Sequence, residues 1–415
     1  MTVLQAPSHD TADGKPDRDS AVIPEKPKLT MDMSNSINPV LQTSEHAYIT
    51  TALVTIDDEA VEAAAQHINE RLEIESYTPR TWRSHALHIC PPEPYDPSLP
   101  ETRRSLDWLF LIASLNFSFW SELEGTPRRY GVEWREGWGS EKMVVHTGYW
   151  SLVAAIDRAL EEGIPITDPA FYASETQCPD STLAHVFRAA PQSTEGLPLL
   201  VERIAILRQN GAILCKHFGG SFQGFYDAFA ARTQREGTAL QLVKTVAETF
   251  PSFQDSTVYA GQRVYFWKRA QILVAETWAA FYPPAAGAPH PLFPGAAGPA
   301  MHELTMFADY RVPQVLHHLG LLRYPPALAD ALRAHTPLAP GAREEVSIRA
   351  ASIVAVERVR RAMRARRADT EEISSVLIDF YLWDLAKRIE GGTDAVQGVR
   401  TDEILPAHRT RSIWY

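Results

Sequence analysis

The sequence predicts a mostly α-helical protein, with one large helical domain over residues 46–415 and a single small β-hairpin. Three observations support this fold class. Most long segments repeat their apolar residues at helical spacing, glycine and proline separate these segments, and only one pair of short segments alternates apolar and polar residues. The chain has 415 residues, of which 45% are hydrophobic, which is enough to bury a large core.

The first 45 residues differ in composition from the rest of the chain. They are rich in Pro, Ser, Asp and Lys and poor in aromatic residues, so they cannot bury enough surface to offset the entropy of ordering. We therefore expect residues 1–45 to be a disordered tail. The first expected helix follows Ile56-Asp57-Asp58, and its apolar residues share one helical face: Val61, Ala64, Ala65, Ile68 and Leu72.

The next segments give the expected centre of the domain. A helix that is apolar nearly all round is predicted from "RRSLDWLFLIASLNFSFW", and such a helix is typically buried. The hairpin is predicted where "YGVEWRE" and "EKMVVHTG" alternate across "GWGS". The segment "GYWSLVAAIDRALEEGIP" then predicts a helix that ends at Gly163, with Pro165 just beyond it.

The second half of the chain also reads as helical. We expect "LPLLVERIAILRQNGAILCKHFGG" to form two helices separated at Asn210-Gly211, and "QRVYFWKRAQILVAETWAAFY" to form one more. Residues 283–300 form an insertion rich in Pro, Gly and Ala. Two further helices are predicted from "REEVSIRAASIVAVERVRRAMRARR" and "TEEISSVLIDFYLWDLAKRIEGG".

Bulk properties exclude several classes of protein. The formal net charge is -11, so the chain has no excess of Lys and Arg with which to hold a nucleic-acid polymer. Three scattered cysteines without CxxC spacing argue against disulfides or a thiolate zinc site. There is no secretory signal and no apolar run of about 18 residues, so we expect no membrane partner and a cytoplasmic protein, with the nucleus also possible. His85 and His88 alone are a weak metal signal, and we expect no metal and no cofactor.

Two charged residues fall at positions expected to be apolar, and the position of a third, Asp379, is ambiguous. Lys268 shares a predicted helix face with Val264, Tyr265 and Ile272, and Asp384 shares one with Leu377 and Phe380. Asp379 lies nearby on the same predicted helix. A buried charge needs a partner, so each residue is either a site residue or a member of a structural pair. For Lys268 the alternative is a lysine stem that covers aromatic surface while its ammonium reaches water.

Asp309 stands in "TMFADYRVPQVL", between two apolar runs. One interpretation is that it caps the following helix, because aspartate is a preferred N-cap. However, Pro313 favours the first helical position, which would place the cap at Val312 and leave Asp309 free to point elsewhere. The spacing slightly favours a site.

Several long motifs together resemble the queuosine salvage family, the queuosine-5'-phosphate N-glycosylases. In chain order they are "LNFSFW", "HTGYWSLVAAIDRALEEGIPIT", "KHFGGSFQGF", "FPSFQDSTVYAGQRVYFWKRAQILVAETW", "TMFADYRVPQVLHHLG", "LIDFYLWDLAK" and "HRTRSIWY". The resemblance covers roughly residues 50–415. It implies a helical fold similar to that of the helix-hairpin-helix DNA glycosylases, and hydrolysis of the N-glycosidic bond of queuosine 5'-monophosphate to release queuine for salvage into tRNA.

The resemblance also implies roles for individual residues. Asp309 corresponds to the catalytic carboxylate, which would stabilise positive charge on the ribose. Lys268 or the pair His408-Arg409 would supply a cation for the 5'-phosphate. The other expected substrate-binding residues are His88, Phe307, Tyr310, Arg311, Asp379 and Asp384. Two alternatives remain open: a glycosylase that acts on a nucleic-acid polymer, and a non-catalytic protein that binds queuine or a nucleotide.

Overall fold

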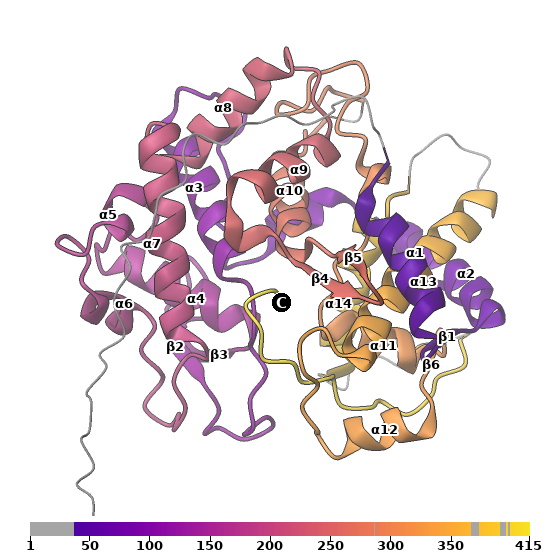
Figure 1. Ribbon diagram of the computed structural model, residues 1–415. Coiled ribbons are helices and arrows are strands. Elements are labelled where there is room, and N and C mark those ends of the chain that lie inside the picture. Colours follow the sequence, from indigo (N-terminus) through magenta and orange to yellow (C-terminus); the bar gives the residue numbers. More distant parts are fainter. Residues whose placement is uncertain (1–36, 286, 367–372, 391–395, 397–398) are drawn as a thin grey trace, which may run out of the picture.

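The computed structural model describes residues 37–285, 287–366, 373–390, 396 and 399–415, and it confirms a mostly helical fold (Figure 1). Within these residues the α-helices are α1 (Pro39–Thr51), α2 (Asp58–Ile74), α3 (Pro100–Leu115), α4 (Tyr149–Glu161), α5 (Pro169–Ala173), α6 (Asp180–Val186), α7 (Leu200–His217), α8 (Phe222–Arg232), α9 (Ala239–Thr249), α10 (Lys268–Ala280), α11 (Arg311–His318), α12 (Pro326–Arg333), α13 (Arg343–Arg366) and α14 (Ser375–Glu390). Short 3-10 helices are η1 (Pro79–Ser84), η2 (Pro251–Phe253) and η3 (Met301–Glu303).

The predicted hairpin is present, and the described residues contain further strand pairs that were not predicted. All pairs are antiparallel: β2 (Gly131–Arg135) with β3 (Met143–Thr147), β4 (Ser256–Tyr259) with β5 (Gln262–Tyr265), and β1 (Thr55–Ile56) with β6 (Leu322–Arg323). Ala260 and Gly261 join β4 to β5 with φ of 47° and 79°. Positive φ at both positions is typical of a tight two-residue hairpin turn. The prediction that Gln262–Tyr265 are helical was therefore wrong, and α10 begins at Lys268.

Glycine marks one helix end as predicted but not another. Gly163 has φ 79° and follows the end of α4, as expected. Helix α7 instead runs without a break through Asn210-Gly211, so the predicted division into two helices was wrong. A Cβ on Gly211 would lie 2.7 Å from Cε2 of Tyr172 and 2.8 Å from the carbonyl oxygen of Pro169. This glycine therefore permits close packing of α5 on α7 rather than a turn.

Helix α1 begins inside the segment that was predicted to be a disordered tail. Asn38 caps it, because its Oδ1 accepts a hydrogen bond from the Val40 amide at 2.9 Å and its Nδ2 donates to the Glu303 carbonyl at 2.9 Å. The Thr51 hydroxyl donates to Ser347 of α13 at 3.0 Å. The folded part thus starts before residue 46. The remainder of the predicted tail, residues 1–36, lies outside the described residues.

We expect deletion of residues 1–52 to destabilise the protein strongly. Val40 and Ala47 are fully buried and pack in the main core. Removing the whole helix would expose the α13 surface beneath it, and loss of even one buried methyl group typically costs about 0.5–1.5 kcal/mol. Thermal unfolding of this deletion, with a deletion of residues 1–36 as control, measures the effect. Equal melting temperatures for the two proteins would contradict the stabilising role of α1.

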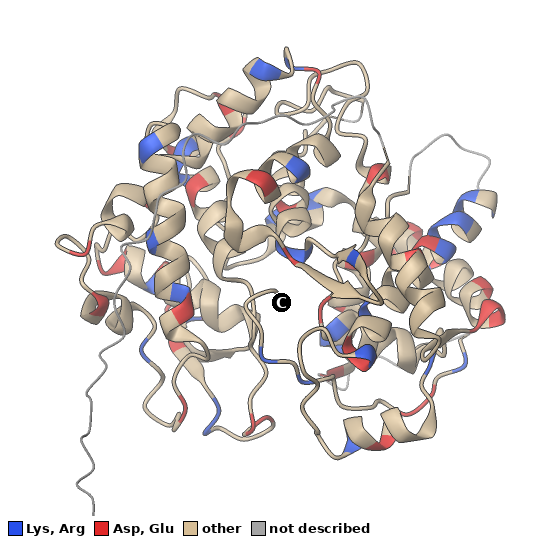
Figure 2. Ribbon diagram, viewed as in Figure 1, with Lys and Arg blue, Asp and Glu red and all other residues tan. Residues whose placement is uncertain are grey.

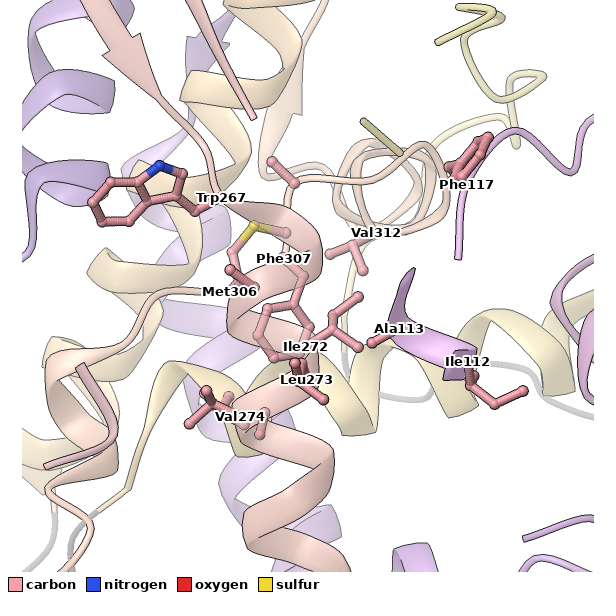
Figure 3. Packing of buried hydrophobic residues seen from close by; sticks show 14 of the residues in the cluster. Ile112, Ala113, Phe117, Trp267, Ile272, Leu273, Val274, Met306, Phe307 and Val312 are labelled. Atoms are coloured by element: carbon pink, nitrogen blue, oxygen red, sulfur yellow. The ribbon is translucent and has the colours of Figure 1, made fainter. Parts of the chain in front are cut away.

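Two groups of helices flank the middle of the molecule in Figure 1. Helices α3–α8 lie on one side and α1, α2 and α11–α14 on the other, with α9 and α10 between them. The end of the chain marked C also lies between the groups. Helices α3 and α10 share one buried cluster, in which Ala113 lies near Ile272 and Leu273 (Figure 3). Because this cluster packs α10 against the 304–312 segment, it fixes the position of Lys268 relative to Asp309.

No helix in the described part of the chain is both long enough and apolar enough to span a membrane.

Candidate functional site

A cavity of about 500 Å³ opens between the two groups of helices. Aromatic rings are the commonest groups in its wall, as in many small-molecule sites, and nine charged side chains lie among them. Most of the residues predicted for the site line it: His88, Lys268, Phe307, Asp309, Tyr310, Arg311, Asp379 and Asp384. His408 and Arg409 are not among the lining residues.

Lys268 is the first residue of α10 and is only 4% exposed. Its Nζ donates hydrogen bonds to Asn116, at 3.1 Å to the carbonyl oxygen and 3.3 Å to Oδ1. Val264 and Tyr265 belong to β5 and not to the helix. Of the residues predicted to share a helical face with Lys268, only Ile272 lies in α10. Burial lowers the pKa of Lys268 to about 8, although the Asp309 carboxylate opposes the shift. The lysine is therefore a buried cation beside Asp309, and its ammonium does not extend into water.

A buried ion pair holds the start of α10 in place. The Lys268 amide donates to Oδ2 of Asp255 at 3.2 Å, and the same oxygen accepts from Arg349 Nη2 at 2.6 Å. Arg349 also lies over the ring of Tyr415, 4.1 Å from the centroid, and Tyr415 lines the cavity. Because each charge in this group has a partner, it can remain buried and fix the Lys268 backbone.

Asp309 caps α11 and also faces the cavity. Its Oδ1 accepts hydrogen bonds from the amides of Arg311 at 2.8 Å and Val312 at 2.9 Å. Helix α11 begins at Arg311, so the prediction that Pro313 opens the helix and frees Asp309 was wrong. Within the described residues Oδ2 accepts no hydrogen bond. Burial raises the pKa of Asp309, while Lys268 and the two amides oppose the shift and favour the carboxylate. The capping and site interpretations are therefore compatible.

Asp379 supports the segment that carries Asp309. Its Oδ2 accepts a hydrogen bond from the Phe307 amide at 3.0 Å. Burial, and then the nearby charge of Asp309, raise the pKa of Asp379 well above its usual value. Two neighbouring carboxyl groups near one lysine do not ionise equally easily. Because Asp309 has two amide donors and Lys268, we assign the negative charge to Asp309.

Asp384 and His88 lie in other parts of the wall. Oδ2 of Asp384 accepts a hydrogen bond from the Tyr77 hydroxyl at 2.6 Å, and burial raises the pKa of Asp384. Nδ1 of His88 is 2.7 Å from the Trp82 carbonyl oxygen, and the His88 ring stacks on Trp82. Burial lowers the pKa of His88 to about 3, so the ring is neutral. Since a carbonyl can only accept, Nδ1 carries the proton and Nε2 is an acceptor.

Glu276 is a lining residue that the sequence interpretation missed. It is 8% exposed, and its Oε1 accepts a hydrogen bond from the Tyr149 hydroxyl at 3.4 Å. Burial raises the pKa of Glu276 to about 7. Lys268, Ile272 and Glu276 follow one another at intervals of four residues along α10, and all three line the cavity. That spacing was visible in the sequence and could have identified Glu276.

Aromatic rings near Glu276 form a flat part of the wall. The rings of His85 and Trp150 stack with centroids 3.7 Å apart and an interplanar angle of 2°. Trp383 lies against Trp150 edge to face, 5.6 Å away. The rings of His85 and His88 are 4.9 Å apart, and the described residues contain no group of three or more His, Cys, Asp or Glu placed to hold a metal ion. The wall suits a flat heteroaromatic ligand, which aromatic side chains bind by stacking.

His408 and Arg409 lie apart from this cavity. Nε2 of His408 is 3.2 Å from the Tyr415 hydroxyl, and burial together with Arg349 lowers the pKa of His408 to about 3. His408 is therefore uncharged. Arg409 pairs with Glu122 at 2.9 Å and lines a second cavity of about 560 Å³. Neither residue brings a cation into the first cavity. Among residues 408–415, only Tyr415 lines that cavity.

Comparisons with known proteins agree with one another. Residues 96–415 match a family model described as queuosine salvage protein. A protein of Schizosaccharomyces pombe named "Queuosine 5'-phosphate N-glycosylase/hydrolase" is 38% identical over 386 residues, which cover 91% of this chain and 99% of the relative. Relatives of the same name are 37% identical in Sphaerobacter thermophilus, over 91% of this chain and 97% of the relative, and 36% identical in Mus musculus, over 87% and 94%.

Proposed function

Because the chain belongs to the queuosine salvage protein family, we propose that it hydrolyses the N-glycosidic bond of queuosine 5'-monophosphate and releases queuine for salvage into tRNA. The observation that carries this proposal is that Lys268 and Asp309 are both buried at the wall of an aromatic cavity, close enough for each charge to shift the pKa of the other. A carboxylate supported by a cation, next to a surface for a flat base, is the arrangement that cleavage of a ribosyl C–N bond requires.

Asp309 supplies the negative charge in the proposed mechanism. As the C–N bond lengthens, positive charge develops on the ribose, and a carboxylate near the anomeric carbon stabilises it. Oδ1 of Asp309 accepts the two hydrogen bonds of the helix cap. Oδ2 accepts none from the described residues and is available at the cavity that Asp309 lines. Lys268 keeps the group ionised in spite of its burial. The aspartate therefore keeps its orientation throughout the reaction, which avoids reorganisation at the moment of bond cleavage.

The aromatic end of the cavity receives the base. The stacked pair His85–Trp150 and the nearby Trp383 give flat surfaces for it. The departing base needs a proton to leave as a neutral molecule, and a carboxyl group with a raised pKa can donate one near neutral pH. Glu276 has this property and lies at this part of the wall. We assign it as the proton donor to the base, directly or through water. A water molecule then adds to the anomeric carbon, and the proton that it loses restores the Glu276 carboxyl group, so the products are neutral queuine and ribose 5-phosphate.

The distribution of charge favours a mononucleotide over a polymer. In the described part of the ribbon drawn in Figure 2, acidic and basic residues are interspersed, without a continuous basic stripe of the kind that follows a phosphate backbone. The formal net charge of -11 also disfavours binding of a nucleic-acid polymer. The three cysteines Cys90, Cys178 and Cys215 are all unpaired, which fits a reducing compartment, and we place the reaction in the cytoplasm.

The test is to incubate the purified protein with queuosine 5'-monophosphate, the nucleoside queuosine and intact queuosine-containing tRNA, and to measure free queuine by mass spectrometry. We expect the base to be released from the mononucleotide and not from tRNA. Release from tRNA would favour a polymer glycosylase. Tight binding of the mononucleotide without release of base would favour a non-catalytic binding protein.

We expect Asp384→Asn to reduce discrimination between queuine and a simpler 7-deazaguanine base. Asp384 lines the cavity, Tyr77 holds one of its oxygens, and its charge can meet the amine of the queuine side chain. A charge-assisted hydrogen bond contributes about 1.5–3 kcal/mol, so the ratio of kcat/KM values for substrates with and without the amine is expected to fall about tenfold or more. Equal losses on both substrates would show that Asp384 contacts another part of the substrate.

A further inference from the structure

Five charged side chains form a chain of alternating sign at the rim of the cavity. In order they are Arg129, Glu124, Arg311, Glu390 and Lys387. Arg129 and Arg311 pair with Glu124 at 3.6 Å and 3.4 Å. Arg311 and Lys387 also both pair with Glu390, and the Lys387 distance is 3.0 Å. Three cations thus share two carboxylates, so the chain has an excess positive charge and a cation at each end.

All three cations line the first cavity, but only one of the two carboxylates does. Arg129, Arg311, Lys387 and Glu124 line the first cavity, Arg311 and Glu124 also line the second, and Glu390 lines the second alone. The side chains of Arg129 and Arg311 are 13% and 15% exposed, while those of Glu124 and Glu390 are 38% and 39% exposed. Water therefore screens the carboxylates more than it screens the two arginines.

Arg129 retains donor capacity for a further ligand, and all three cations lie close together. Nε of Arg129 is buried and has no hydrogen-bond partner, which is costly unless a ligand supplies one. Arg311 lines the cavity two residues beyond Asp309. The pKa of Lys387 is lowered by burial and then by the nearby charges of Arg311 and Arg129, so the three cations are close enough to repel one another. An anion placed among them would relieve that repulsion.

We propose that Arg129, Arg311 and Lys387 together bind the 5'-phosphate of the substrate and set the preference for nucleotide over nucleoside. This inference rests on the proposed function and deepens it. Lys268 is an unsuitable phosphate ligand, because its ammonium is buried, donates to Asn116 and supports Asp309. With the phosphate at the rim beside Arg311, the ribose lies over Asp309 and the base reaches the aromatic wall.

The test compares queuosine 5'-monophosphate with queuosine on the wild type, Lys387→Met and Arg129→Met. The loss of one charge-assisted phosphate contact is expected to lower the nucleotide-to-nucleoside ratio of kcat/KM about 10- to 100-fold in each variant. Lys142→Met is the matched control, since Lys142 also pairs with a glutamate, Glu136, but lies away from the cavity. The ratio for this control is expected to equal that of the wild type.

A second arm measures binding of ribose 5-phosphate and of ribose by calorimetry, which does not require turnover. We expect the wild type to bind ribose 5-phosphate more tightly than ribose, with an advantage that falls as salt is added and that both cavity variants lose. Nucleotide-to-nucleoside ratios within twofold of wild type in both variants, or equal losses on both substrates, would overturn the proposal. If the wild type binds ribose 5-phosphate preferentially but releases no base from either substrate, the proposed function fails while the phosphate site stands.

Discussion

Asp309→Asn is expected to lower turnover of queuosine 5'-monophosphate about 100- to 1000-fold, the usual loss when one well-placed electrostatic stabiliser is removed. In this structure the substitution removes the charge of the side chain and can keep its hydrogen bonds. The amide oxygen of asparagine can still accept hydrogen bonds from the amides of Arg311 and Val312, so the cap of α11 is preserved. Only the charge is lost. Affinity for the intact substrate should change much less, because the ribose carries no positive charge before the bond breaks.

The measurement is single-turnover kinetics and substrate affinity for Asp309→Asn, with thermal unfolding as the control for folding. A variant with normal melting temperature and more than about a tenth of wild-type turnover would contradict the catalytic role, given the usual size of this effect. Asp309 would then be a capping residue only.

Lys268→Met is expected to lower kcat/KM by about 100-fold or more, because Asp309 would be left buried without its nearby cation. The wild type should also lose activity as the pH rises through about 8. Lys268 has a pKa lowered to about 8, so it carries its charge below this pH and loses it above. Its support of the Asp309 carboxylate is lost over the same range. The methionine has no such proton, so the variant should lack the fall near pH 8 and keep only the earlier fall that follows deprotonation of Glu276, whose pKa is about 7.

Two pH profiles of kcat/KM, for the wild type and for Lys268→Met, test this prediction. If the fall near pH 8 persisted in the methionine variant, the titration would belong to another group, such as the proton donor Glu276 or Lys387 at the cavity rim. Turnover close to wild type in the methionine variant would show that Asp309 stays ionised by means of its two amide donors alone.

The sequence predicted the helical content and the β2–β3 hairpin, because both depend on local periodicity. The errors occurred where distant contacts outweigh local signals. Asn210-Gly211 resembles a break, yet the glycine lies inside α7, where a neighbouring helix packs closely. Gln262–Tyr265 was assigned to a helix because an apolar run precedes α10, and the Ala260-Gly261 turn that pairs it with β4 was overlooked.

The site residues also divide into those that local sequence patterns could identify and those that only the fold brings together. Charged residues at apolar positions identified Lys268 and Asp384, and both line the cavity, as does Asp379, whose position in the sequence was ambiguous. The sequence could not show that His408 is buried and uncharged beside Tyr415, because that depends on how the last residues of the sequence lie between the two groups of helices. Nor could it show that Arg129 and Lys387 meet Arg311. These cations are far apart in sequence, and only the fold places them on one rim.

The most direct test of the whole account is the stoichiometry of products from queuosine 5'-monophosphate. Purified wild-type protein and Asp309→Asn would be assayed side by side, with free queuine and ribose 5-phosphate quantified in the same samples. Hydrolysis of the N-glycosidic bond predicts equal amounts of the two products from the wild type and almost none from the variant. Release of inorganic phosphate with the nucleoside left intact, or no free queuine from the wild type, would contradict the proposed reaction.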